Sequence, residues 1–165
     1  KTLNIDNPRL SCRLKGYEKF SPRRIILDKY LEIKLNSKIF KSSKKGNTII
    51  FHNSSNISKT EVLRKKGIIL VKSKLNKEKN FDLKSVLKKL YILGINNLLV
   101  EGGDRITKNL LKKGLINQFY LFKSPNNLPN NKKKQIFTSA NILSKYGNRI
   151  KVSSKLAKDT ITIYK

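Results

Sequence analysis

One segment combines a carboxylate, two glycines and a polar helix start, the residue types that hold a phosphate-bearing cofactor. Residues 101–109 read EGGDRITKN and follow the apolar run Leu98–Val100. Glycines let backbone N–H groups approach a phosphate, and the N-terminus of a helix adds a partial positive charge. The segment therefore predicts a phosphate cradle where a parallel strand ends. The structural alternative is a plain strand-to-helix turn, in which glycine supplies a positive φ and Asp104 caps the helix.

A second segment, near the start of the chain, carries a turn and two arginines. Residues 2–13 read TLNIDNPRLSCR. Asp6-Asn7-Pro8 is typical of a turn, because Asp can hydrogen-bond to its own backbone and Pro presets φ. Arg9 and Arg13 could clamp a phosphate bidentately. A surface turn with two solvated arginines is the alternative that the residues alone leave open.

The elements that must position these segments alternate along the chain. Ser58 is expected to cap a helix over 59–66, with Glu61 as its capping-box partner. Asp82 opens a second helix that ends at Gly94. Its apolar stripe comprises Leu83, Val86, Leu87, Leu90 and Tyr91. Short apolar runs predict buried strands over residues 24–28, 47–52 and 67–71.

The second half of the chain continues the alternation. Asn97–Val100 is expected to be a strand that runs into the glycine turn, and a helix with Ile106, Leu110 and Leu111 inward follows and closes at Gly114. Further strands are predicted over residues 116–122, 150–152 and 160–164. Alternating strands and helices with buried runs indicate an α/β domain with a mostly parallel sheet, flanked by helices on right-handed crossovers.

Taken together, the two segments and the strand between them resemble a known family. The pattern Thr-x-x-x-Asp-Asn-Pro-x-Leu-x-x-Arg over residues 2–13 is similar to a loop of the reductase domain in the bifunctional riboflavin deaminase-reductases. Residues 23–28 (RRIILD) resemble the next strand. Residues 98–103 (LLVEGG) and 110–117 (LLKKGLIN) resemble the nucleotide-binding turn, helix and following strand. The blocks agree in order and rough spacing, and the resemblance weakens after Pro125.

The resemblance implies a dihydrofolate-reductase-like fold and a reaction. The family uses NADPH to reduce the ribosyl group of 5-amino-6-(5-phosphoribosylamino)uracil, its small-molecule phosphoribosylaminopyrimidine substrate. It also implies a homodimer. Carried over by position, Thr2 and Asp6 are cofactor-side residues, and Leu10, Arg13 and Glu101 contact the substrate. The implied diphosphate cradle comprises Gly102, Gly103, Asp104, Arg105, Ile106, Thr107, Lys108 and Asn109.

The implied chemistry suits these residues. A hydride adds to C1 of an opened ribosylamine, so the imine-like carbon must become electrophilic and the opened oxygen must be protonated. A positioned carboxyl group can do either. We expect Asp6 and Glu101 to be the catalytic polar groups, without assigning which one moves a proton. NADPH carries the redox step while the protein orients the reactants.

Several positions depart from the resembled pattern. Asp104 follows the glycines where a small or neutral residue is expected, and its carboxylate would compete with a diphosphate unless Arg105 offsets it. Residues 126–132 (NNLPNNK) lack the expected leucine-glycine character. The chain is expected to be one reductase domain over residues 1–165, and Thr2 already matches the interior of a family motif. We therefore expect a preceding strand and helix, without which the chain would be poorly soluble or inactive.

One His and one Cys limit metal and disulfide chemistry. They cannot build the zinc site of the family's deaminase half, so no metal and no deaminase domain are expected in this chain. His52, at a strand end, is interpreted as a satisfied surface or core group, and Cys12 as a small semi-buried filler. No run of apolar residues is long enough to span a membrane, and nothing is typical of a signal peptide, which favours a cytoplasmic protein.

The formal charge of +28 on 165 residues raises a competing interpretation. A basic nucleic-acid-binding module could use residues 15–20 and Arg23-Arg24 as a basic-aromatic patch. However, Lys dominates over Arg, and Lys, Asn and Ile are enriched together, which favours compositional drift over a nucleic-acid surface. Two further alternatives stay within the fold. One is a stand-alone reductase acting on the still-aminated diaminopyrimidine, and the other is a non-catalytic reductase fold.

Overall fold

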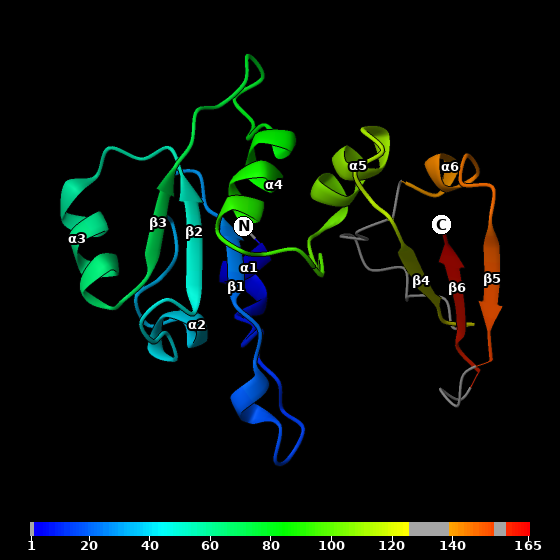
Figure 1. Ribbon diagram of the computed structural model, residues 1–165, viewed down its shortest axis with the longest axis horizontal. Helices are drawn as coiled ribbons and strands as arrows, with labels where there is room; N and C mark the ends of the chain where they lie inside the picture. The colour runs from blue at the N-terminus through cyan, green and yellow to red at the C-terminus, as the bar shows by residue number, and fades with distance from the viewer. Residues whose placement is uncertain (1, 126–138, 154–157) are drawn as a thin grey trace. The chain divides into compact units, whose positions relative to one another are not determined.

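The computed structural model describes residues 2–125, 139–153 and 158–165. The chain divides into two compact units, residues 1–97 and residues 98–165, and each is described by itself. Figure 1 shows a sheet and helices in each unit. None of the helices in these ranges is long and apolar enough to cross a lipid bilayer. The Lys/Asn-rich segment 126–132, which departs from the resembled family, lies outside the described residues.

The first unit is built on a parallel sheet of three strands, in the order β1-β2-β3. These strands are β1 (Arg24–Leu27), β2 (Thr48–His52) and β3 (Ile69–Lys72). Ile26 lies opposite Ile50, which in turn lies opposite Leu70. All three strands fall where the apolar runs predict them.

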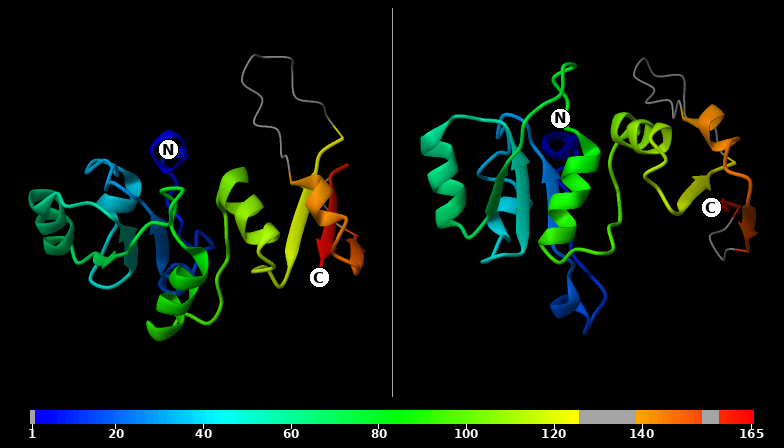
Figure 2. Two further views of the ribbon diagram at one scale, coloured as in Figure 1. Left: turned by 90° about the horizontal axis from the view of Figure 1, so that it is seen from above. Right: turned by 45° about the horizontal axis from the view of Figure 1, so that its top comes forward.

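Both faces of β2 are covered, and all five of its residues are buried. On one face Ile50 packs in a cluster with Ile26, Leu31 and Leu63. On the other face Ile49 and Phe51 pack with two residues of α4, Val86 and Leu90. Because a parallel strand buried on both faces needs apolar side chains at successive positions, the run TIIF forms β2 rather than an alternating edge strand. The sheet thus has a core on each side (Figure 2).

Helices α3 (Ile57–Lys65) and α4 (Leu83–Ile92) connect and cover this sheet. The predicted cap of α3 is wrong. Asn56, not Ser58, is the N-cap, and its side-chain oxygen accepts a hydrogen bond from Lys59 N. Ser58 lies inside the first turn, because the helix begins two residues earlier than predicted.

Helix α4 begins as expected, since Asp82 is its N-cap and accepts a hydrogen bond from Lys84 N. Gly94 follows its end with φ +76°. Leu83, Val86 and Leu90 are buried, but Tyr91 is 70% exposed and does not belong to the apolar stripe. Tyr91 follows Leu90 directly, and the turn of about 100° per residue places it at the rim of the packed face.

Shorter elements precede and follow β1. They are α1 (Thr2–Asp6), the 3₁₀ helix η1 (Glu18–Phe20) and α2 (Lys38–Lys41). Asp28 organises the segment after β1, because its two carboxylate oxygens accept hydrogen bonds from Glu32 N and Ile33 N, both at 2.8 Å. This arrangement places Leu31 and Ile33 in the core.

The second unit contains an antiparallel sheet in the order β4-β6-β5. Its elements are α5 (Asp104–Lys112), β4 (Phe119–Lys123), α6 (Ala140–Leu143), β5 (Arg149–Val152) and β6 (Thr160–Tyr164). Leu110 and Leu111 of α5 and Leu143 of α6 are buried. The predicted helix and the predicted pair of strands at the end of the chain are confirmed. Gly114 ends α5 with φ +60°.

The expected buried strand over Asn97–Val100 is wrong. Residues 97–103 form neither helix nor strand, and Leu99 is 80% exposed. A strand needs a neighbour to pair its N–H and C=O groups. Among the described residues, the strands that pair with one another are those of the two sheets above, and none pairs with residues 98–100. The apolar run alone therefore does not make a strand here.

Candidate functional site

The N-terminal segment after α1 has unusual backbone angles. Asn7 and Leu10 have φ of +41° and +49°, the left-handed region that residues other than glycine rarely adopt. Such strain persists only where surrounding contacts enforce it, and it clusters at functional sites. Asp6 is the last residue of α1 and not part of a turn as predicted, while residues 7–10 form neither helix, strand nor turn and have a local conformation that the rest of the unit must hold.

Three contacts hold this segment on the first unit. The Asn7 side-chain oxygen accepts a hydrogen bond from Lys38 N, the first residue of α2, at 2.9 Å. Leu10 packs against the core cluster that contains Ile26. Arg24 donates a hydrogen bond to the Arg9 carbonyl oxygen at 3.5 Å. The backbone between Asn7 and Leu10 is thus fixed on both sides of Pro8.

The predicted polar residues of this segment face solvent. Asp6, the last residue of α1, and Arg13 are both exposed. The Thr2 side chain lies outside the described atoms. Cys12 is half-buried, as predicted, and its backbone N–H donates to Ser21 Oγ at 3.1 Å. Asp6 and Arg13 therefore remain accessible to a ligand, while the backbone between them is anchored.

Arg24 is a residue that the sequence reasoning missed. It is only 5% exposed at the start of β1, and burial lowers the pKa of its guanidinium group. Its guanidinium group donates hydrogen bonds to neutral oxygens. The acceptors are Arg9 O, Ser42 Oγ, Ser42 O, Ser43 Oγ and Asn47 Oδ1. Arg24 thereby ties the N-terminal segment to the turn between α2 and β2. The sequence feature that could have pointed to this role is the position of an arginine at the start of an apolar strand.

The glycine turn does not have the geometry of the structural alternative, in which glycine supplies a positive φ and Asp104 caps the helix. Gly103 is the N-cap of α5 with φ −69°, and Gly102 also lacks a positive φ. The turn therefore does not need glycine for its φ angles, and Asp104 is the first residue of the helix rather than its cap. A side chain at residue 102 would instead be crowded by Ile106. A Cβ atom there would lie 3.2 Å from Ile106 Cγ2 and 3.3 Å from Ile106 Cβ.

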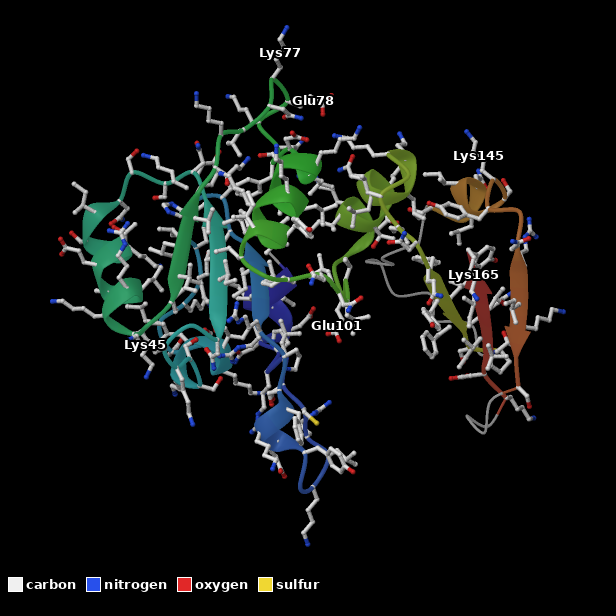
Figure 3. The ribbon with its side chains drawn as sticks, viewed as in Figure 1. Lys45, Lys77, Glu78, Glu101, Lys145 and Lys165 are labelled. Atoms are coloured by element: carbon white, nitrogen blue, oxygen red, sulfur yellow. The ribbon has the colours of Figure 1, made fainter. Side chains whose placement is uncertain are left out.

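Side chains of α5 reinforce this turn. Thr107 Oγ1 donates to the Gly102 carbonyl oxygen at 3.5 Å, and Asn109 Nδ2 donates to Arg105 O at 3.1 Å. The Asp104 carboxylate accepts a hydrogen bond from Ser139 Oγ at 3.2 Å. Glu101 is exposed before the turn (Figure 3). Because no side chain of the described residues caps α5, its N-terminus keeps the character of an anion site.

His52 is buried at the carboxyl end of β2, with 4% of its surface exposed. Burial lowers the pKa of its imidazole, and the Lys72 and Arg64 charges lower it further, whereas the Ser54 backbone and Asp28 act in the opposite direction. Its Nδ1 atom has no hydrogen-bond partner among the described residues. His52 is a core residue, which is one of the two predicted alternatives. Its Nδ1 atom, however, lacks the hydrogen-bond partner that the prediction included.

With this geometry in place, comparison with known proteins identifies the family. The family model "RibD C-terminal domain" matches residues 1–162. The chain belongs to the RibD C-terminal domain family. It is 38% identical over 125 residues to riboflavin biosynthesis protein RibD of Aquifex aeolicus, and 30% identical over 124 residues to the RibD of Actinobacillus pleuropneumoniae.

These alignments cover 75% of the chain but only 33% and 32% of the two RibD proteins, so the chain spans about a third of their length. The RibD of Buchnera aphidicola subsp. Baizongia pistaciae is 31% identical over 150 residues, which are 83% of the chain and 38% of that protein. A solved structure of Acinetobacter baumannii RibD superposes with a TM-score of 0.72 and 18% identity, over 99% of this chain and 44% of that one. The dihydrofolate-reductase-like α/β fold is thus confirmed.

Within this RibD C-terminal domain, the predicted site residues form two groups. Thr2, Asp6, Leu10 and Arg13 belong to the first unit, where Leu10 contacts the core. Glu101 and the cradle residues, including Lys108, belong to the second unit. Each group is organised within its own unit by the hydrogen bonds described above. Across the described ranges, no group of three or more His, Cys, Asp or Glu side chains could hold a metal ion.

Proposed function

We propose that this chain is a reductase of riboflavin biosynthesis that uses NADPH to reduce the ribosyl group of 5-amino-6-(5-phosphoribosylamino)uracil to the ribityl form. The match of residues 1–162 to the RibD C-terminal domain carries this proposal. The relatives named riboflavin biosynthesis protein RibD support the pathway. Reduction consumes one hydride from NADPH and one proton, so the domain must bind two anionic molecules and manage a proton.

The glycine turn suits the diphosphate of NADPH. Gly102 and Gly103 place no side chain over the start of α5, and no side chain caps that helix. The Asp104 carboxylate would repel a diphosphate, but its hydrogen bond with Ser139 gives it another partner. When bound, NADPH supplies the hydride that adds to C1 of the opened ribosylamine. We assign the backbone of residues 102–105 and the side chains of residues 106–109 to holding it.

The N-terminal segment suits the substrate and the other side of the cofactor. Arg13 is exposed and can bind the sugar phosphate, next to Leu10, whose backbone the core fixes. Asp6 and Glu101 are exposed carboxylates that can hold or deliver the proton required at the opened sugar oxygen. Thr2 and Asp6 are assigned to the cofactor side. The proposal includes a homodimer and a cytoplasmic location.

Cofactor choice is tested by thermal shift and fluorescence titration. NADPH is expected to raise the melting temperature more than NADH, because a ligand that binds only the folded state stabilises it by mass action. Equal shifts with both cofactors, or no shift at saturating NADPH, would contradict the choice of NADPH. An oligonucleotide titrated in parallel at rising salt distinguishes a nucleic-acid module, which would lose affinity steeply as counterions compete.

The site residues are tested by kinetics on the uracil substrate and on its diaminopyrimidine counterpart. Asp6→Asn or Glu101→Gln is expected to lower kcat by about a hundredfold to ten-thousandfold if the residue moves a proton. Arg13→Ala should mainly raise KM, because phosphate binding is shared by the ground and transition states. Glu18→Gln, an exposed carboxylate on η1, is the matched control and should leave both constants unchanged. Parental kinetics in all three site variants would refute the assignment, and preference for the diaminopyrimidine would correct the substrate.

A further inference from the structure

Two asparagine side chains anchor the chain on either side of Asp6. Asn4, two residues before Asp6 on α1, donates from Nδ2 to the Glu32 carbonyl oxygen at 2.9 Å. Asn7, directly after Asp6, accepts a hydrogen bond from Lys38 N at 2.9 Å. These bonds reach residues that are 28 and 31 positions away in the sequence. Helix α1 is therefore fixed on the first unit, while the Asp6 side chain at its end stays exposed.

Asn7 combines this hydrogen bond with an unusual backbone angle. Its φ of +41° lies in the left-handed region, which Asn and Asp adopt more readily than other residues with a side chain. Leu10 has a φ of +49° in the same segment. Because Leu has no polar side chain that could stabilise this conformation locally, contacts with the rest of the unit must enforce it. The bond from Asn7 to α2 is one of the contacts on which the path of the chain toward Arg13 depends.

Helix α2 holds this segment from both of its ends. At its N-terminus, the Lys38 N–H, which has no acceptor within the helix, donates to Asn7. At its C-terminus, Ser42 Oγ donates to Lys38 O at 2.6 Å and accepts from Arg24 Nη1 at 2.7 Å. The same Arg24 nitrogen donates to Arg9 O at 3.5 Å. One helix of four residues thus fixes residues 7 and 9 together.

We propose that Asn7 is a positioning residue of the reductase, which acts through Asp6 and Arg13 rather than on the reactants. Its hydrogen bond to α2 fixes the direction in which the chain leaves α1, and thereby the place of the Asp6 carboxylate relative to the Arg13 guanidinium. This inference rests on the proposed function, which assigns Asp6 to the proton and Arg13 to the sugar phosphate. A group that moves a proton must lie within hydrogen-bond reach of it, and a displacement of about 1 Å can cost about a hundredfold in rate.

Two substitutions at residue 7 separate the hydrogen bond from the backbone angle. Asn7→Gly keeps the left-handed φ but removes the acceptor. Asn7→Asp keeps both, because Asp tolerates this region and its carboxylate can accept from Lys38 N. Asn76→Gly is the matched control. Asn76 Oδ1 accepts from Asn80 N at 2.8 Å beside Lys79, whose φ is +56°, so the same kind of bond is removed from a segment to which no site residue is assigned.

Steady-state kinetics with NADPH and the uracil substrate give the first readout. Asn7→Gly should lower kcat/KM by about tenfold to a hundredfold, with a fall in kcat that a loss of stability alone would not cause in the folded protein. Asn7→Asp should restore both constants to near those of the unaltered chain, and Asn76→Gly should leave them unchanged. Melting curves confirm that each variant is folded at the assay temperature. Unaltered kinetics in Asn7→Gly, or equal losses in Asn7→Gly and Asn7→Asp, would overturn the proposal.

Lys38→Pro removes the same hydrogen bond from the other side, and it replaces Asn7→Gly if that variant does not fold. Proline at the first position of a helix lacks only an N–H that the helix itself does not use. Ser37 already has the extended angles, φ −64° and ψ 151°, that a proline requires of the residue before it. Lys38→Pro should reproduce the kinetic loss of Asn7→Gly, and the double variant should be no worse than either. Additive losses would show that the two residues act independently and would contradict the proposal.

Amide hydrogen exchange separates this proposal from the proposed function. The Cys12 N–H donates to Ser21 Oγ at 3.1 Å, so its exchange reports whether the chain between Asn7 and Arg13 stays anchored. Exchange should be at least about tenfold faster in Asn7→Gly and unchanged in Asn76→Gly. An unaltered chain that reduces nothing, with exchange that responds as expected, would refute the reaction and leave the anchoring by Asn7 in place. An active chain in which Asn7→Gly changes neither exchange nor kinetics would refute only the positioning role.

Discussion

Apolar runs of sequence are buried to different extents in the two units. In β2, the run TIIFH lies between two parallel strands with packed clusters on both faces, and all five residues are buried. In β4, the run FYLFK is also mainly apolar, yet Tyr120, Phe122 and Lys123 are exposed. Packing on both faces therefore distinguishes β2 from β4, in addition to the lysine and tyrosine that β4 contains. Residues 1–97 therefore hold two cores, whereas β4 of the second unit carries the exposed side chains of Tyr120 and Phe122.

The largest effect expected from this difference is in a matched pair of phenylalanine substitutions. Phe51→Ala removes a ring that is fully buried between β2 and α4, and should lower the free energy of unfolding by about 3–5 kcal/mol. Phe122→Ala removes an exposed ring and should change it by about 0.5 kcal/mol or less. Urea denaturation of the unaltered chain and of the two variants, each at the same low protein concentration, measures the two changes in unfolding free energy. Similar losses at the two positions would show that the second sheet is as well covered as the first.

An intermediate effect is expected from the neighbouring arginines at the start of β1. Arg24→Met removes the donor to Ser42 O, to the buried Ser43 Oγ and to Asn47 Oδ1, and should cost about 1–3 kcal/mol of unfolding free energy. It should also raise the KM of the proposed substrate, because the Arg9 carbonyl loses its contact. Arg23→Met is the control, since the exposed Arg23 makes one hydrogen bond, to Leu93 O. Equal stability of the two variants would contradict the role given to Arg24.

The smallest effect concerns pH and again belongs to the first unit, because His52 is the only histidine. Burial holds the pKa of His52 below its ordinary value of 6.5. The unfolded state therefore binds this proton more readily, and stability is expected to fall as the pH drops below about 6.5. Thermal unfolding between pH 8 and pH 5 measures the slope. His52→Gln should reduce the slope of stability against pH. An unchanged slope would show that another group causes the pH dependence.

Much of the first unit follows from local patterns. The runs that contain Ile26, Ile50 and Leu70 predict three strands, and Asp82 and Gly94 mark the ends of α4. The cap of α3 was misplaced because Asn56 and Ser58 are both good N-caps, and the choice depends on where the preceding turn ends. The strand at Leu98–Val100 was wrongly predicted because an apolar run forms a strand only beside a neighbour that pairs with it.

Some features of the candidate site could likewise be predicted from the sequence, and others could not. The segments around Asp6 and Gly102 are recognisable by residue type and spacing, which follow from the chemistry of turns and phosphates. Arg24 could not be assigned a role from sequence, because its acceptors come from residues 9, 42, 43 and 47 and meet only in the folded unit. Why residue 102 is a glycine could also be explained only with the structure, which shows that Ile106 would crowd a side chain there.

By itself, the sequence determined the family, the order of β1, β2, α3, β3 and α4 in the first unit, and the segments that could bind phosphate. These depend on residue types at short separations, which local geometry fixes. Only the tertiary structure decided which apolar runs are covered, since burial depends on residues distant in sequence that pack on each face. It left Phe51 of β2 enclosed and Phe122 of β4 exposed, although each lies in a mainly apolar strand.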